Sequence, residues 1–136
     1  MTSTRIEWAL ELLAAGPDDD LLEFGCGSGV AAERLLGLGP RSLLAIDRSG
    51  TAVGAARRRL ADQIQGGRVR VERRELAALP ADRSFTAALG INVNLFWTGP
   101  AVAECEVLLA ALGPSGRLLL VYDAPGDRAE EIADRA

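Results

Sequence analysis

The feature that most constrains the fold is a regular alternation between short apolar runs and longer helical patterns along the chain. The apolar runs read as buried strands, and the stretches between them repeat their apolar residues with the period of a helix. Strands that alternate with helices favour a parallel sheet with helices on both faces and right-handed crossovers. The sequence therefore predicts a doubly wound, mostly parallel α/β fold.

The expected elements follow from these periods and from capping signals. Thr4 and Glu7 stand at capping-box spacing at the start of the first helix, and Thr98 with Pro100 is typical of the start of a later one. The expected strands are residues 21–24, 41–47, 68–76, 85–93 and 116–123. The expected helices are residues 4–14, 30–39, 50–64, 98–113 and 126–136.

Length and composition fit one domain over residues 1–136. A chain of 136 residues with 49% hydrophobic and 25% charged residues is long enough to bury roughly two thirds of its unfolded surface. No run approaches the roughly 20 apolar residues that span a bilayer, and the N-terminal residues lack the pattern of a signal peptide. We expect a cytoplasmic protein with no membrane partner.

The charge balance bears on the partner. The net charge is −4, from 19 acidic and 15 basic residues, and every basic residue is arginine. An acidic chain is a poor match for a nucleic-acid duplex, so no nucleic-acid partner is expected. The runs RRR at 57–59 and RVRVERR at 68–74 could still attract phosphate, but solvated helix and strand faces are the favoured interpretation.

The chain lacks histidine, which is the commonest general base and metal ligand. Its absence excludes nucleophilic schemes of the Ser/His/Asp and Cys/His types. Cys26 and Cys105 stand alone without zinc-ligand spacing. No metal site and no disulfide framework are therefore expected.

A glycine-rich turn directly follows the first expected strand, in the stretch LLEFGCGSGVAAERLLGLG. Gly25, Gly27 and Gly29 have no Cβ, so a ligand can approach the main chain there. In a parallel sheet this turn lies at the carboxyl ends of the strands, where ligands bind. Asp47 ends the second strand, where a carboxylate can accept both hydroxyls of a ribose. A bound nucleoside is favoured over glycines that only serve strand–helix packing.

Two nucleoside cofactors compete for this geometry. A dinucleotide-binding fingerprint needs a third glycine at position 30, but this chain has Val30 there. Glu23 lies two residues before the first glycine, where a carboxylate attracts a cation rather than a pyrophosphate. A dehydrogenase is therefore the least favoured of the functions considered.

The pattern E-F-G-C-G-S-G resembles motif I of the class I S-adenosylmethionine-dependent methyltransferases, and AIDRSG is similar to their second motif. The resemblance implies S-adenosyl-L-methionine as cofactor and the strand order 3-2-1-4-5. It implies that Asp47 holds the ribose and that Arg48 lies along the adenine. It also implies that Glu23, Gly25, Gly27 and Gly29 belong to the cofactor site.

The resemblance extends to later segments. RRELAALP followed by SF is similar to the segment after the third strand, where Glu75 would face the adenine amino group and Leu76 would cover the ring. Asn92 would contact the methionine portion of the cofactor, and Cys26 would contribute only its backbone. LGPSGRLLLV looks like the family's turn into the fifth strand.

Three departures from the family stand out. The family usually has Asp at the position of Glu75 and an acidic residue at the position of Thr86. Its sheet normally ends in a hairpin of strands six and seven, which has no counterpart before Ala136. Because an open edge strand is normally covered, we expect a homodimer through the edge of the fifth strand or through the C-terminal helix.

The resulting expectation is methyl transfer to a small-molecule acceptor. The leaving group is already activated by its positive charge, so the protein mainly orients the partners, and no catalytic residue is identified. The alternative is a non-catalytic nucleoside-binding or assembly module. Arg5 and Trp8 lie on a helix that often covers the pocket in this family, although Trp8 reads as ordinary packing. The residues expected near the acceptor are Asn92, Asn94, Phe96, Trp97, Tyr122 and Asp123.

Overall fold

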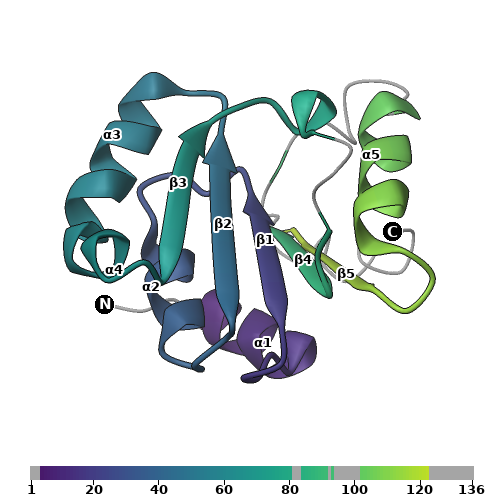
Figure 1. Cartoon of the computed structure of the whole chain (residues 1–136), viewed down its shortest axis with the longest axis horizontal. Helices are drawn as coiled ribbons and strands as arrows, with labels where there is room; N and C mark the ends of the chain where they lie inside the picture. The colour runs from purple at the N-terminus through teal and green to yellow at the C-terminus, as the bar shows by residue number, and fades with distance from the viewer. Residues whose placement is uncertain (1–3, 81–83, 92, 94–101, 123–136) are drawn as a thin grey trace.

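A computed structural model describes residues 4–80, 84–91, 93 and 102–122 (Figure 1). Five strands form one sheet in the order β3-β2-β1-β4-β5, and every neighbouring pair is parallel. This confirms the predicted doubly wound fold and its strand order. The strands are β1 (Asp20–Phe24), β2 (Ser42–Asp47), β3 (Val69–Arg73), β4 (Ala87–Ile91) and β5 (Arg117–Val121).

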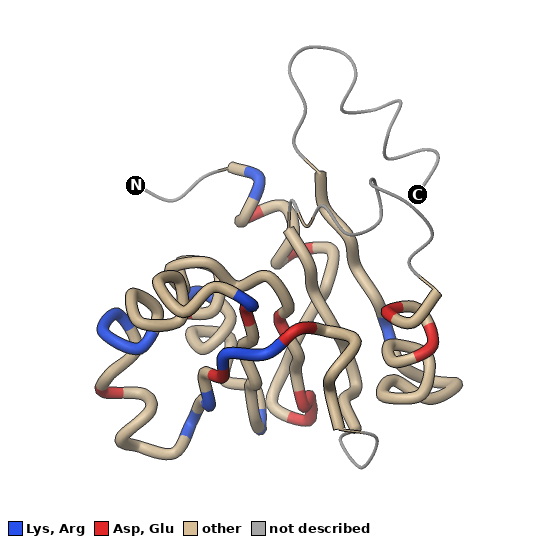
Figure 2. The backbone as a smooth tube through the Cα atoms, turned by 90° about the horizontal axis from the view of Figure 1, so that it is seen from above, with Lys and Arg blue, Asp and Glu red and all other residues tan. Residues whose placement is uncertain are grey.

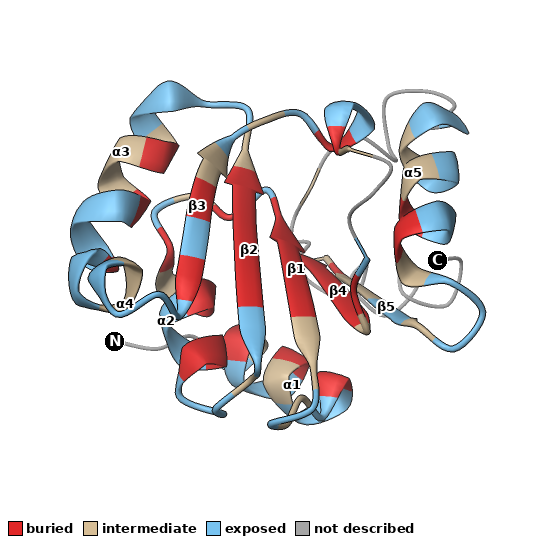
Figure 3. Ribbon diagram, in the orientation of Figure 1, coloured by how far each residue is buried: buried red, intermediate tan, exposed pale blue. Residues whose placement is uncertain are grey.

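Helices cover both faces of the sheet. One core cluster joins one face of the sheet to α1, α2 and α3, and a second joins the other face to η1 and α5. The central strands β1 and β2 are buried along most of their length, whereas β5 is exposed at its start (Figure 3). The helices are α1 (Thr4–Leu13), α2 (Val30–Leu36), α3 (Gly50–Arg59), α4 (Ala61–Gln65), the 3₁₀ turn η1 (Leu76–Ala78) and α5 (Val102–Leu112).

The expected helix over residues 50–64 is two helices, α3 and α4. They meet at Leu60, whose φ of −102° and ψ of 17° lie outside the helical range. Leu60 is fully buried, whereas α4 has no buried residue. The bend therefore keeps Leu60 in the core while the chain turns towards β3.

Further expectations are corrected or left open. The strand expected over residues 68–76 ends at Arg73, and Leu76 begins η1. Trp8 was expected to pack, but 53% of it is exposed.

The predicted cap at Thr98, Pro100 and the helix over residues 126–136 lie outside the described residues. The homodimer expected at the β5 edge stays a prediction.

A polar network ties the amino ends of β1, β4 and β5 together. The hydroxyl of Thr86 donates to Oδ1 of Asp19 at 2.6 Å and accepts the Asp20 N–H at 2.9 Å. Arg117 donates to Oδ2 of Asp19 at 3.2 Å. The bond from Thr86 is the main cause that lowers the pKa of Asp19. Thr86, which departs from the family pattern, therefore has a structural role at the end of the sheet opposite the glycine loop.

Within the described residues, no helix is long and apolar enough to cross a membrane.

Candidate functional site

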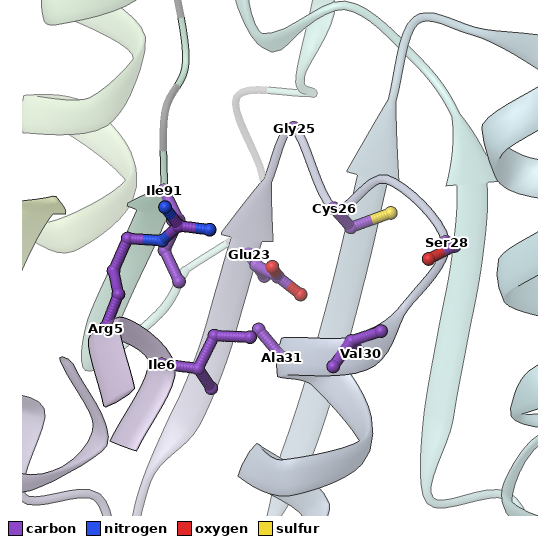
Figure 4. A pocket seen from close by; sticks show the side chains of 9 residues that line it. All are labelled: Arg5, Ile6, Glu23, Gly25, Cys26, Ser28, Val30, Ala31 and Ile91. Carbon is purple, nitrogen blue, oxygen red and sulfur yellow. The ribbon is translucent and has the colours of Figure 1, made fainter. Parts of the chain in front are cut away.

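A pocket of about 160 Å³ lies at the carboxyl end of β1, beside the glycine loop (Figure 4). The described residues leave room there for a group of amino-acid size. Its lining residues come from α1, β1, the glycine loop, α2 and β4, and are Arg5, Ile6, Glu23, Gly25, Cys26, Ser28, Val30, Ala31 and Ile91.

The loop between β1 and α2 is held in a conformation that suits glycine. Gly25, Gly27 and Gly29 have φ of 66°, 57° and 89°. This is the left-handed region, which side chains with a Cβ rarely adopt. The Cys26 N–H donates to the Ile46 carbonyl at 3.0 Å, which ties the loop to the end of β2.

The three glycines differ in what surrounds them. A Cβ on Gly25 would lie 2.8 Å from a methyl group of Val93, and one on Gly29 would lie 3.2 Å from the Cβ of Ala56. A Cβ on Gly27 would meet nothing within 4 Å. Gly25 and Gly29 are therefore needed for packing, whereas Gly27 borders open space.

Asp47 ends β2 beside this loop. Its Oδ2 accepts the main-chain N–H of Gly27 at 2.9 Å, and its Oδ1 accepts that of Ser49 at 2.9 Å. Each carboxylate oxygen keeps further lone pairs for a ligand. The structure thus brings together the glycine loop and the acidic residue that the sequence singled out.

Glu23 is the unusual residue of the pocket. It lies on the central strand β1, is only 2% exposed, and its Oε1 accepts no hydrogen bond among the described residues. Burial, with a smaller contribution from the negative charge of Asp47, raises the pKa of Glu23 to about 8. A buried carboxyl group without a partner is costly, so it marks a place where a cationic or donor group fits.

Cys26 is held as a neutral thiol. Burial, aided by the charges of Glu23 and Asp47, raises its pKa to about 12. A thiolate is the reactive form of cysteine, so Cys26 is a poor nucleophile at neutral pH. This fits the prediction that it contributes its backbone to the loop.

Arg5 and Ile6 reach the pocket from α1, although neither was among the predicted site residues. Figure 4 shows the Arg5 side chain rising from α1 over Ile91, with its guanidinium group on the side of the Glu23 carboxyl. The sequence offered one signal, namely that the first helix often covers the pocket in the family it resembles. Periodicity alone could not show which of its residues points inward.

The remaining predicted site residues lie around rather than in the pocket. Arg48 is exposed directly after β2, and Glu75 is exposed before η1. Leu76 is buried in the core cluster on the α5 face. The roles predicted for these three stay predictions. Tyr122 is half-buried after β5, whereas Asn92, Asn94, Phe96, Trp97 and Asp123 lie outside the described residues.

Comparison with known proteins identifies relatives with a common name. A protein named ribosomal protein L11 methyltransferase from Shewanella amazonensis is 33% identical over 88% of this chain and 38% of its own length. One of the same name from Chromohalobacter salexigens is 34% identical over 84% of this chain and 36% of its length. The chain thus spans less than half the length of the curated relatives it matches.

Solved structures share the fold. A methyltransferase from Geobacter sulfurreducens in complex with S-adenosyl-L-homocysteine superposes with a TM-score of 0.71 and 21% identity, over 88% of this chain and 48% of that one. The N-methyltransferase NodS from Bradyrhizobium japonicum, in complex with the same compound, superposes with a TM-score of 0.71 and 20% identity, over 85% of this chain and 59% of that one. At these identities the likeness shows the fold alone.

One expectation is wrong. The predicted partners were a small-molecule acceptor and no nucleic acid, but the relatives are named for a ribosomal protein as their substrate. The charge argument concerned nucleic acid alone and gives no information on the methyl acceptor. The profile of one family, described as "Methyltransferase domain", matches residues 21–116, which include the glycine loop and Asp47. The chain therefore belongs to this methyltransferase family and has the fold of the class I S-adenosylmethionine-dependent enzymes.

Proposed function

We propose that this domain binds S-adenosyl-L-methionine at the carboxyl ends of β1 and β2 and transfers its methyl group to a protein. The observation that carries the proposal is the buried Glu23 carboxyl, which lies in a pocket of amino-acid size beside the glycine loop. The cofactor's methionine end has an ammonium group that matches this carboxyl. Family membership and neighbours crystallised with S-adenosylhomocysteine support the choice of cofactor.

The described residues fit the two ends of the cofactor. Asp47 would accept the ribose hydroxyls, and Gly27 would leave space for the ligand over the loop. Glu23 would pair with the ammonium group of the methionine end. Arg5, which lines the same pocket, would pair with its carboxylate, so the pocket offers a carboxyl group and a guanidinium group to the two ends of an amino-acid group.

When bound, the cofactor supplies a methyl carbon on a positively charged sulfur, which leaves as a neutral thioether. The chain has to hold the methionine and ribose ends, align the acceptor with the methyl group and keep water out. Cys26 stays a neutral thiol and does not compete as a nucleophile. We assign no general base.

The relatives' common name supports a ribosomal protein as the acceptor. Such an acceptor fits the cytoplasmic location expected from the sequence.

Titration calorimetry with S-adenosylhomocysteine and with NAD tests the cofactor. We expect micromolar binding of the first and none of the second. Incubation with labelled S-adenosylmethionine and a mixture of purified ribosomal proteins then tests transfer. Label on a ribosomal protein supports the proposal, whereas binding without transfer to any protein would favour the non-catalytic nucleoside-binding module. Failure to bind S-adenosylhomocysteine would overturn the cofactor assignment.

A further inference from the structure

An acidic chain carries a strongly basic segment. Residues 48–74 hold eight arginines and two carboxylates, a net charge of +6, whereas the rest of the chain holds seven arginines and 17 acidic residues, a net charge of −10. The segment forms α3, α4 and β3, which contact one another. Figure 2 shows arginine positions gathered along this side of the molecule. Among the described residues, positive charge is therefore concentrated on this side.

Five of these arginines form what we call the β3 arginine surface. All five side chains are exposed, and no carboxylate among the described residues lies within ion-pair distance of any of them. They come from the loop after β2, from α3 and from both ends of β3. The members of the surface are Arg48, Arg57, Arg58, Arg68 and Arg73.

Three members are held in place by main-chain carbonyls. A carbonyl oxygen fixes a guanidinium group through hydrogen bonds but leaves its full positive charge for a ligand. The surface is therefore ordered without being neutralised. The bonds run from Arg57 to the Val71 carbonyl at 2.9 and 3.2 Å, from Arg68 to that of Leu36 at 2.8 Å, and from Arg73 to that of Arg48 at 3.2 Å.

Arginines elsewhere in the described chain are arranged differently. Three exposed ones each donate to a carboxylate, which cancels most of their charge. This contrast shows that unpaired arginine is not a general property of the surface. The pairs are Arg34 with Glu7, Arg41 with Asp20, and Arg117 with Asp19.

The dimensions of the surface suit an extended polyanion. Arg68 and Arg73 flank β3, and five residues at about 3.3 Å each place them roughly 16 Å apart. A nucleic-acid strand carries one phosphate about every 3.4 Å along a helix, so this length faces about five phosphates. Guanidinium groups pair well with phosphate oxygens.

We propose that the β3 arginine surface binds the sugar–phosphate backbone of RNA. The arrangement of charge carries this proposal, and it does not depend on the cofactor. RNA is favoured over an acidic protein because three of the guanidinium groups are held in place, and such planar groups pair with phosphate oxygens. The relatives' name adds support, since ribosomal proteins are assembled on RNA. The proposal goes beyond the interpretation of these runs as solvated faces.

Fluorescence anisotropy with a labelled 20-nucleotide RNA, measured from 25 to 200 mM salt, tests the proposal. The test variant is R57Q/R58Q/R73Q, in which the amide groups introduced at positions 57 and 73 can still donate to the same carbonyls. The control variant is R34Q/R41Q/R117Q, which changes the net charge by the same amount. Circular dichroism and thermal unfolding establish that both fold.

We expect the wild-type chain to bind RNA with an affinity that falls as salt rises. The test variant should bind RNA at least tenfold more weakly at low salt. The slope of the logarithm of its affinity against the logarithm of the salt concentration should be shallower by about 2, because each lost phosphate contact contributes about 0.7. The control variant should stay within about twofold of the wild type. Equal loss in both variants, no RNA binding at low salt, or tighter binding of polyglutamate than of RNA would each overturn the proposal. Cofactor titrations on the test variant should be unchanged.

Discussion

The main-chain N–H of Gly27 donates to Oδ2 of Asp47 at 2.9 Å, which joins the glycine loop after β1 to the end of β2. The two residues are 20 positions apart, and the contact exists because the parallel strands end side by side. The carboxylate that is proposed to hold a ribose therefore also holds the loop that is proposed to lie under the ligand. On this proposal, Asp47 couples ligand binding to the order of the loop.

Asp47→Ala should weaken S-adenosylhomocysteine binding by about 1.5 to 3 kcal/mol, the range for losing a charged hydrogen-bond acceptor. Calorimetry measures this directly. Asp62→Ala on α4, an exposed carboxylate away from the loop, is the matched control and should bind as the wild type does. Unchanged affinity in the Asp47 variant would remove the ribose role.

Gly27→Ala and Gly29→Ala should separate binding from folding. Both residues have positive φ, so both substitutions carry a similar backbone strain. At Gly27 the new methyl group points into open space, and we expect at least a tenfold loss of S-adenosylhomocysteine affinity with a small change in melting temperature. At Gly29 the new methyl group would lie 3.2 Å from the Cβ of Ala56, so we expect the larger fall in melting temperature for this variant. The reverse pattern would make Gly27 a packing glycine.

Glu23 should make the ligand-free protein less stable as the pH rises. Its pKa is about 8 in the fold against 4.5 ordinarily, so between these values the unfolded chain has released a proton that the folded chain retains. The contribution of this retained proton to stability is full below pH 4.5 and is lost progressively up to about pH 8. Glu23→Gln should therefore show a smaller fall in melting temperature from pH 5 to pH 8.5.

The pH range from 4.5 to about 8 distinguishes Glu23 from the other groups whose pKa values are shifted. The pKa values of Asp19 and Asp20 are lowered, so these residues act on stability at more acidic pH. The pKa of the Cys26 thiol is raised from 9.0 to about 12, so this group acts on stability only above about pH 9. Equal pH dependence in wild type and variant would show that Glu23 ionises normally. The variant should also bind S-adenosylhomocysteine more weakly, because the ammonium group loses its charged partner.

Arg5→Ala should discriminate between ligands. If Arg5 pairs with the methionine carboxylate, the variant loses about tenfold or more in affinity for S-adenosylhomocysteine and little for methylthioadenosine, which lacks the amino-acid group. Arg34→Ala on α2, whose guanidinium pairs with Glu7, is the control. An equal loss for both ligands would mean that Arg5 only supports the fold. Failure of the wild type to bind either ligand would count against the cofactor instead.

The sequence predicted those features that depend on local pattern. Apolar runs predicted the strands, and the positions of the glycine loop and Asp47 at the ends of the first two parallel strands predicted that they lie together. The bend at Leu60 was missed because a helical period continues through it and only burial in the tertiary core breaks it. Arg5 was missed as a lining residue because its position depends on how α1 packs on the sheet.

The bond between Arg57 and Val71 also has a consequence for solubility. The main-chain N–H of Arg74 donates to the Asp47 carbonyl in β2. Successive residues of a strand point their main-chain groups to opposite sides. The Val71 carbonyl, three residues earlier, therefore points away from β2, towards the open edge of the sheet. An outward carbonyl on an edge strand is a template for strand addition by another molecule. Arg57 occupies that acceptor and places a charge over it. This margin of the sheet is therefore protected against edge-to-edge aggregation.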